Sequence, residues 1–132
     1  MSGVAHLYIH LPFCARRCGY CDFYSTSGKE ARAPAYLESL LAELEEAADL
    51  MAPLQSVYLG GGTPTRIGAR PLARLLAAVR RRCAAEAEIS VEANPETVTP
   101  ALAGSLLAAG ATRISLGVQS FSERLRRNLE RS

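Results

Sequence analysis

Hydrophobic and polar residues follow two patterns along the chain, short apolar runs and longer stretches with helical periodicity. The short runs have the length of a strand and are often bounded by Gly or Pro; they lie at 6–11, 56–60, 88–93 and 113–118. The longer stretches repeat apolar residues at three- and four-residue spacing; they lie at 34–50, 71–83, 99–109 and 122–131. We therefore expect strands and helices in alternation, with a loop between the first strand and the first helix.

Alternation of this kind indicates an α/β fold with a parallel sheet and right-handed crossovers. In such sheets, functional residues gather at the carboxyl ends of the strands. The unusual motifs of the chain all follow a predicted strand, in the order CARRCGYC, GGGTPT, EANPE and GVQSF. This coincidence predicts one composite site at the carboxyl edge of the sheet.

The composition is that of an ordinary globular domain. Of the 132 residues, 48% are hydrophobic and 21% are charged, and the net charge of +2 gives no reason to expect nucleic acid as a partner. The sequence has no signal peptide pattern and no apolar run of the roughly 18 residues that a membrane span needs. We expect a cytoplasmic protein without a transmembrane segment, in which clustered cysteines more often bind metal than form disulfides.

Cys14, Cys18 and Cys21 are spaced at i, i+4 and i+7 after the first strand. On a helix they would be three core cysteines, but the intervening arginines and glycine favour a loop. A zinc site is another alternative, although structural zinc usually has four ligands and no fourth lies nearby. Cys83 falls on the apolar stripe of the second helix and is expected in the core. Three thiolates in a loop also suit a [4Fe–4S] cluster whose fourth iron stays open to a ligand.

The C-x3-C-x2-C spacing resembles the cluster motif of the radical S-adenosylmethionine (radical SAM) enzymes, and Tyr20 fits the aromatic residue that this family packs near the adenine. The resemblance implies that Cys14, Cys18 and Cys21 bind the cluster and that the open iron binds S-adenosylmethionine. It also implies that an electron donor, such as flavodoxin or ferredoxin, reduces the cluster. The reduced cluster then cleaves S-adenosylmethionine to methionine and a 5′-deoxyadenosyl radical, which abstracts hydrogen from a substrate.

GGGTPT (60–65) is neither a P-loop nor a G-x-G-x-x-G motif. It could be only a turn, but glycines directly after a buried strand also let backbone groups approach a ligand closely. The stretch is similar to the motif with which radical SAM enzymes hold the methionine amino group. The resemblance therefore implies ligand contacts from Gly61, Gly62 and Thr63.

Polar side chains also follow or end the later strands. A carboxylate at Glu92 is costly without a partner, so it is either an outward-facing ion pair or an acceptor for a ribose or an ammonium group. Gln119 can donate and accept, which suits a ribose or a carboxylate. Arg131 either reaches a ligand carboxylate or is solvated. The resemblance matches these three residues, together with Tyr8 and Tyr20, to positions around S-adenosylmethionine.

Four stretches, LYIHLPFC, GGGTPT, EANPETV and RISLGVQSFSE, are similar to the oxygen-independent coproporphyrinogen III oxidase-like branch of the family. The decarboxylating oxidases have a further cysteine two residues after the third, where this chain has Phe23. The CDF sequence instead resembles the HemW-type haem chaperones, which implies binding of haem or porphyrin and delivery of haem to respiratory haemoproteins. A coproporphyrinogen III oxidase, another hydrogen-abstracting oxidoreductase and a zinc-binding module are the alternatives, so enzymatic activity stays open.

The core of this family is a partial (β/α)6 barrel, followed by a C-terminal region that would carry the haem-binding elements. The chain has about four βα units by its alternating pattern. We therefore expect residues 1–132 to form the N-terminal part of a radical SAM core domain, incomplete at its C-terminus.

Overall fold

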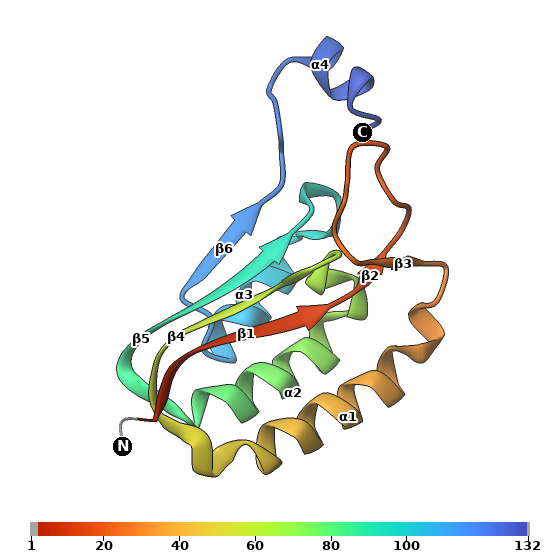
Figure 1. Ribbon diagram of the computed structural model, residues 1–132. Coiled ribbons are helices and arrows are strands. Elements are labelled where there is room, and N and C mark those ends of the chain that lie inside the picture. The colour runs from red at the N-terminus through yellow and green to blue at the C-terminus, as the bar shows by residue number, and fades with distance from the viewer. Residues whose placement is uncertain (1–2, 132) are drawn as a thin grey trace.

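The predicted alternation of strands and helices is present in the computed structural model, which describes residues 3–131. Four parallel strands pair in the order β1-β4-β5-β6. Their bounds are Val4–Leu11 (β1), Met51–Gly61 (β4), Cys83–Ala93 (β5) and Arg113–Leu116 (β6). Each βα unit thus adds its strand beside the preceding one, and the carboxyl ends of all four strands lie along one edge (Figure 1).

Three helices cover one face of the sheet, and a fourth lies beyond its carboxyl edge (Figure 1). The covering helices are Ala33–Glu46 (α1), Ala69–Arg80 (α2) and Pro100–Ala108 (α3), and the fourth is Glu123–Asn128 (α4). A second, two-stranded parallel pair, Phe13–Cys14 (β2) and Thr26–Ser27 (β3), opens and closes the cysteine loop, residues 14–25. Short 3-10 turns lie at Glu30–Arg32, Ala48–Leu50, Pro64–Ile67 and Pro95–Thr97.

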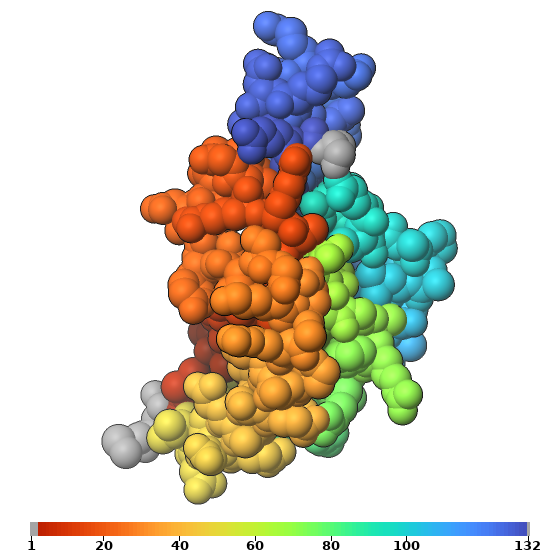
Figure 2. All heavy atoms as spheres, turned by 90° about the vertical axis from the view of Figure 1, so that its right-hand side faces the viewer, coloured from red at the N-terminus to blue at the C-terminus, as the bar shows by residue number. Residues whose placement is uncertain are grey.

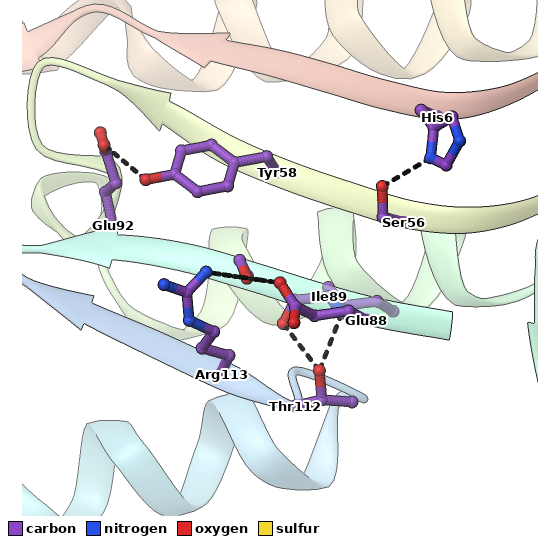
Figure 3. Close-up of polar contacts among 9 residues, drawn as sticks. His6, Ser56, Tyr58, Glu88, Ile89, Glu92, Thr112 and Arg113 are labelled. Carbon is purple, nitrogen blue, oxygen red and sulfur yellow. Dashed lines mark hydrogen bonds and ion pairs between the residues drawn. The ribbon is translucent and has the colours of Figure 1, made fainter. Parts of the chain in front are cut away.

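Alternation along the strands gives the sheet two different faces. The helix face is apolar and makes the core, with Leu59, Ile89 and Val91 fully buried against Leu75 and Leu106 of the helices. The opposite face, which we call the open face, has polar side chains; they include His6, Tyr8, His10, Ser56, Tyr58, Glu88, Ser90, Glu92 and Arg113. Several of these side chains hydrogen-bond to one another across neighbouring strands (Figure 3).

The expected helix ends are partly confirmed. Thr99 Oγ1 accepts a hydrogen bond from the Leu102 N–H at 3.1 Å, and Ser122 Oγ accepts one from the Leu125 N–H at 3.4 Å, as N-caps do. Gly110 has a φ of 107°, the left-handed conformation that favours glycine after a helix. The fourth helix was predicted to run to residue 131 but ends at Asn128.

Two predicted helices were too long, because apolar residues continue at a similar spacing past their ends, into a 3-10 turn after the first and into β5 after the second. The first helix ends at Glu46 rather than at residue 50, and the second ends at Arg80 rather than at residue 83. Cys83 is therefore the first residue of β5 and not the end of a helix stripe. Its side chain is partly buried against the core, as expected, and burial raises the pKa of its thiol.

Within residues 3–131, none of the helices combines the length and the apolar character that crossing a membrane requires.

Two adjacent leucines on α3 test how this helix packs. Leu106 is fully buried, whereas Leu107 is 71% exposed. We expect Leu106→Ala to lower the free energy of unfolding by about 2–5 kcal/mol, because it leaves a cavity in the core. Leu107→Ala should change it by less than about 0.5 kcal/mol. Urea denaturation measures both variants, and equal losses would contradict this packing of α3.

Candidate functional site

A cleft of about 560 Å³ lies at the carboxyl edge of the sheet. It is bordered by the loops that follow β1, β4, β5 and β6 and by the C-terminal segment, residues 117–131. Figure 2 shows the red-orange cysteine loop meeting the blue C-terminal segment at this end of the molecule. The predicted site residues that line the cleft are Cys14, Cys18, Tyr20, Cys21, Gly61, Gly62, Thr63, Glu92, Gln119 and Arg131. Tyr8, also predicted, does not line it.

The segment that contains Cys14, Cys18 and Cys21 is not helical and forms a loop, as the sequence predicted. All three of its cysteines are free thiols of intermediate exposure. The Cys21 N–H donates to the Cys18 carbonyl at 3.0 Å, which makes a tight turn between the second and third cysteines. Arg17 Nε donates to the Cys21 carbonyl at 3.1 Å and steadies that turn.

The turn at the end of β4, residues 60–65, which we call the glycine turn, is hydrogen-bonded to the start of the cysteine loop. The Gly62 N–H donates to the Leu11 carbonyl at 2.9 Å, and the Thr63 N–H donates to the Phe13 carbonyl at 2.8 Å. A Cβ at Gly62 would lie 2.7 Å from the Phe13 carbonyl oxygen and 2.8 Å from Cys14 Sγ. A side chain here would push the first cysteine away, so this position requires glycine.

The C-terminal segment reaches back onto the cysteine loop. Arg131 Nη1 lies 3.6 Å from Cys18 Sγ, and Arg131 Nη2 donates to the Gly117 carbonyl. Arg16 donates to the Glu130 carbonyl, which is a second link between the two segments. Arg131 is therefore partly buried in the cleft rather than solvated at the end of the chain.

Gln119 lines the cleft in a left-handed conformation, with a φ of 66°. This region is unfavourable for a residue with a side chain, and such strain is commonly found at functional sites. A Cβ at Gly117 would lie 3.2 Å from Gln119 Nε2 and 3.0 Å from Arg131 Nη2. The absence of a side chain at Gly117 therefore leaves room for both polar groups at the end of β6.

Glu92 is not the outward-facing ion pair that was one of its two predicted roles. The Tyr58 hydroxyl donates to Glu92 Oε1 at 2.7 Å (Figure 3), and no cation pairs with Glu92 within residues 3–131. The hydrogen bond to Glu92, followed by burial, raises the pKa of the Tyr58 phenol. Tyr58 was not among the predicted site residues, although strand alternation puts it on the same face as Gly60, two residues later.

Tyr8 lies on the open face beside this pair and not in the cleft. Its ring stacks on that of Tyr58 with centroids 6.2 Å apart and planes 16° apart. Burial, and the negative charge of Glu92, raise the pKa of the Tyr8 phenol. The Tyr8 hydroxyl lies 3.0 Å from His10 Nδ1, and the other ring nitrogen of His10 lies 3.0 Å from the Tyr24 carbonyl. Tyr8 therefore contacts the site indirectly, through the Tyr58 ring and the His10 side chain.

Further side chains that line the cleft, or that join the turns beside it, were not predicted from the sequence. Arg66 lines it and pairs with Glu30 at 2.8 Å, which lowers the pKa of the Glu30 carboxyl. Thr65 and Thr97 share a hydrogen bond of 2.5 Å between their hydroxyls and so join the turn after β4 to the turn after β5. No local pattern marks such residues, because their partners are distant in sequence.

The structure does not draw the three thiols together around one metal ion. Within residues 3–131, no group of three or more His, Cys, Asp or Glu side chains is arranged to hold such an ion, so neither a zinc site nor a converged set of three thiols is present. A cube needs only thiolates, each on a different iron. The cleft supplies three free thiols beside a backbone that is clear of side chains at Gly62.

The steric requirement at Gly62 can be tested against a glycine in open space. Gly62→Ala should lower the free energy of unfolding by about 1–3 kcal/mol, because its Cβ would meet backbone atoms of Phe13. Gly104, on α3, has no atom within 4 Å of an added Cβ. Gly104→Ala should therefore raise the same free energy by up to about 1 kcal/mol, since alanine favours a helix. Urea denaturation in which both variants were stabilised would contradict this close approach.

The raised pKa values at the open face predict how Glu92 affects tyrosine ionisation. A raised pKa favours the neutral phenol in the folded chain, so this stability is present below the ordinary tyrosine pKa of about 10 and is lost as pH rises through the folded value. Glu92→Gln removes the negative charge beside Tyr58 and Tyr8. Tyrosinate absorbance should then develop at lower pH, and the alkaline loss of stability should be smaller.

Glu86→Gln is the matched control, because Glu86 is an exposed carboxylate on the same strand. Its titration curve should overlay that of the unchanged chain, and a Glu92→Gln curve that did the same would contradict the contact.

Curated relatives match nearly the whole chain. The haem chaperone HemW of Mycobacterium tuberculosis is 47% identical over 132 residues, and that of Escherichia coli K12 is 42% identical over 130 residues; each alignment covers 95% of this chain and 34% of the relative. The anaerobilin synthase of Escherichia coli O157:H7 is 36% identical over 132 residues, covering 96% of this chain and 30% of the relative. The chain thus spans about a third of the length of these relatives.

A solved structure has the same backbone arrangement. Coproporphyrinogen III oxidase from Escherichia coli, a radical SAM enzyme, matches 99% of this chain and 31% of its own with a TM-score of 0.87 and 32% identity. The expected barrel fragment is therefore confirmed as a fold. The family model of the radical SAM superfamily matches residues 8–132. With the cysteine loop and glycine turn placed together as described, the chain belongs to the radical SAM superfamily.

Proposed function

We propose that the chain is the cofactor-binding part of a haem chaperone of the radical SAM superfamily. The observation that carries this proposal is the single cleft that gathers three free thiols, the glycine turn, Glu92 and Gln119. The haem chaperones among the relatives, at up to 47% identity, support the chaperone type. Because the chain spans a third of their length, haem binding and transfer are assigned to the whole protein.

The cysteine loop would hold a [4Fe–4S] cluster through Cys14, Cys18 and Cys21. The hydrogen bonds from the glycine turn to Leu11 and Phe13 fix where the loop begins. The Arg131 guanidinium, beside Cys18 Sγ, brings positive charge to a site where thiolates would gather. Hydrogen bonds to ligand sulfurs are among the features that set the potential of such clusters.

S-adenosylmethionine would occupy the cleft beside the cysteine loop. Together the two cofactors supply one-electron reduction of a sulfonium and hydrogen abstraction, when both are bound. Gly61, Gly62 and Thr63 would place backbone polar groups beside the methionine amino group, and Glu92 would accept a hydrogen bond from a ligand hydroxyl or ammonium. Gln119 and Arg131 offer donors for a carboxylate.

Phe23 favours haem delivery over porphyrinogen decarboxylation. It stands where the decarboxylating oxidases have a further cysteine, and its ring lines the cleft with 70% of its surface exposed. Its exposed ring adds apolar surface to the cleft, which suits a flat apolar macrocycle. Haem or a porphyrin has this chemistry.

A coproporphyrinogen III oxidase is the second candidate, favoured by the backbone match to that enzyme. In either case we propose a cytoplasmic protein that receives electrons from a carrier such as flavodoxin or ferredoxin. For a chaperone, the recipients would be respiratory haemoproteins.

Anaerobic reconstitution with iron and sulfide tests the cluster. We expect about four irons and about four sulfides per chain, with the visible absorbance of a [4Fe–4S] cluster. Replacing Cys14, Cys18 and Cys21 together by alanine should abolish both, because the cluster then has no thiolates. Cys83→Ala is the matched control and should leave them unchanged, since Cys83 packs against the core away from the cleft.

Stoichiometric zinc without sulfide would contradict the cluster and favour the zinc module. Conversion of coproporphyrinogen III by the reconstituted protein with S-adenosylmethionine and a reductant would contradict the chaperone and support the second candidate.

A further inference from the structure

Tyr58 belongs to none of the motifs, yet it makes the one hydrogen bond to the Glu92 side chain that the described residues contain. It lies on β4, two residues before Gly60, with its side chain on the open face. Its hydroxyl donates at 2.7 Å to Oε1 of Glu92, which lies on the neighbouring strand β5 (Figure 3). The contact is shorter than most neutral hydrogen bonds, as expected when the acceptor is a carboxylate.

The second carboxylate oxygen of Glu92 is left for a ligand. Glu92 lines the cleft, and within residues 3–131 its Oε2 accepts no hydrogen bond. A Cβ at Gly60 would lie 3.0 Å from this oxygen, 3.0 Å from the Tyr58 ring and 3.1 Å from the Tyr8 ring. Because Gly60 has no side chain, the rings of Tyr8 and Tyr58 and the carboxylate of Glu92 can pack around this position.

Both the ring and the carboxylate are held in place before any ligand binds. The Tyr58 ring is stacked on Tyr8, which limits its rotation. No arginine or lysine of the described residues pairs with Glu92, so a neutral phenol holds the carboxylate without neutralising its charge. Preorganised acceptors of this kind contribute more to binding than mobile ones, since less freedom is lost.

We propose that Tyr58 is a positioning residue that fixes Glu92 through Oε1 and directs Oε2 towards a donor group of the bound adenosyl ligand. The donor is a ribose hydroxyl or the ammonium of the methionine part, both of which a carboxylate accepts well. The inference rests on the proposed function and adds to it the residue that orients the acceptor.

Tyr58→Phe tests the inference, because it keeps the stacked ring and removes only the hydroxyl. The probe is S-adenosylhomocysteine, titrated by calorimetry into the anaerobically reconstituted chain. We expect about fivefold weaker binding, the effect of one hydrogen bond of typical net strength. Iron and sulfide content should not change.

A double-mutant cycle separates positioning from a general structural effect. If Tyr58 acts through Glu92, Tyr58→Phe should weaken binding in the unchanged chain and have no further effect in Glu92→Gln. Tyr36→Phe is the matched control, because its hydroxyl donates to the His10 carbonyl at the same 2.7 Å and does not line the cleft. It should leave the affinity unchanged.

A second probe, 5′-methylthioadenosine, identifies the ligand group because it has the ribose but no ammonium. Weaker binding of both probes to Tyr58→Phe supports a ribose hydroxyl, and weaker binding of S-adenosylhomocysteine alone supports the ammonium. Unchanged affinity, or equal losses with and without Glu92, would overturn the role of Tyr58 while leaving the proposed function intact. A reconstituted chain without a cluster and without affinity for either probe would overturn both.

Discussion

The close approach of Gly62 to the backbone of Phe13 and Cys14 is the contact on which the rest of the site depends. Parallel pairing of β1 and β4 ends with Leu11 beside Gly61, so the two strands deliver their following loops to the same place. A side chain at Gly62 would occupy the position of the Phe13 carbonyl and Cys14 Sγ. Because glycine stands there, the loop that carries the thiols can lie directly on the glycine turn, to which it is hydrogen-bonded.

The two faces of the sheet have different roles: the helix face forms the hydrophobic core, and the open face has the polar side chains. The helix face buries leucine, isoleucine and valine between strands and helices, and no residue of the proposed site is needed for that packing. The open face and the carboxyl edge have the polar groups, which satisfy one another through Tyr58, Glu92, Ser90 and Arg113. A chain built in this way can change ligand or reaction at its edge without rebuilding its core.

The charged side chains of the cleft are held by different kinds of partner. Arg131 lies against the cysteine loop, and Arg66, which also lines the cleft, is engaged by Glu30. Glu92 instead is held by a phenol, so its negative charge is not cancelled by a neighbour. Such groups suit a ligand that has a carboxylate together with hydroxyl or ammonium donors, as S-adenosylmethionine does.

The sequence alone determined the order of the elements and the positions of the motifs, because apolar periodicity and N-caps such as Thr99 are local properties of the chain. It also identified the three thiols and the glycine turn, since each is a contiguous motif at the end of a strand. It misjudged the ends of the first two helices, because apolar residues continue at the same spacing past Glu46 into a 3-10 turn and past Arg80 towards β5. Only the tertiary structure decided that Glu92 is held by Tyr58 and that Tyr8 lies outside the cleft. Those contacts join residues 34 or more positions apart, or depend on which face a strand presents, and nothing in the local sequence fixes either.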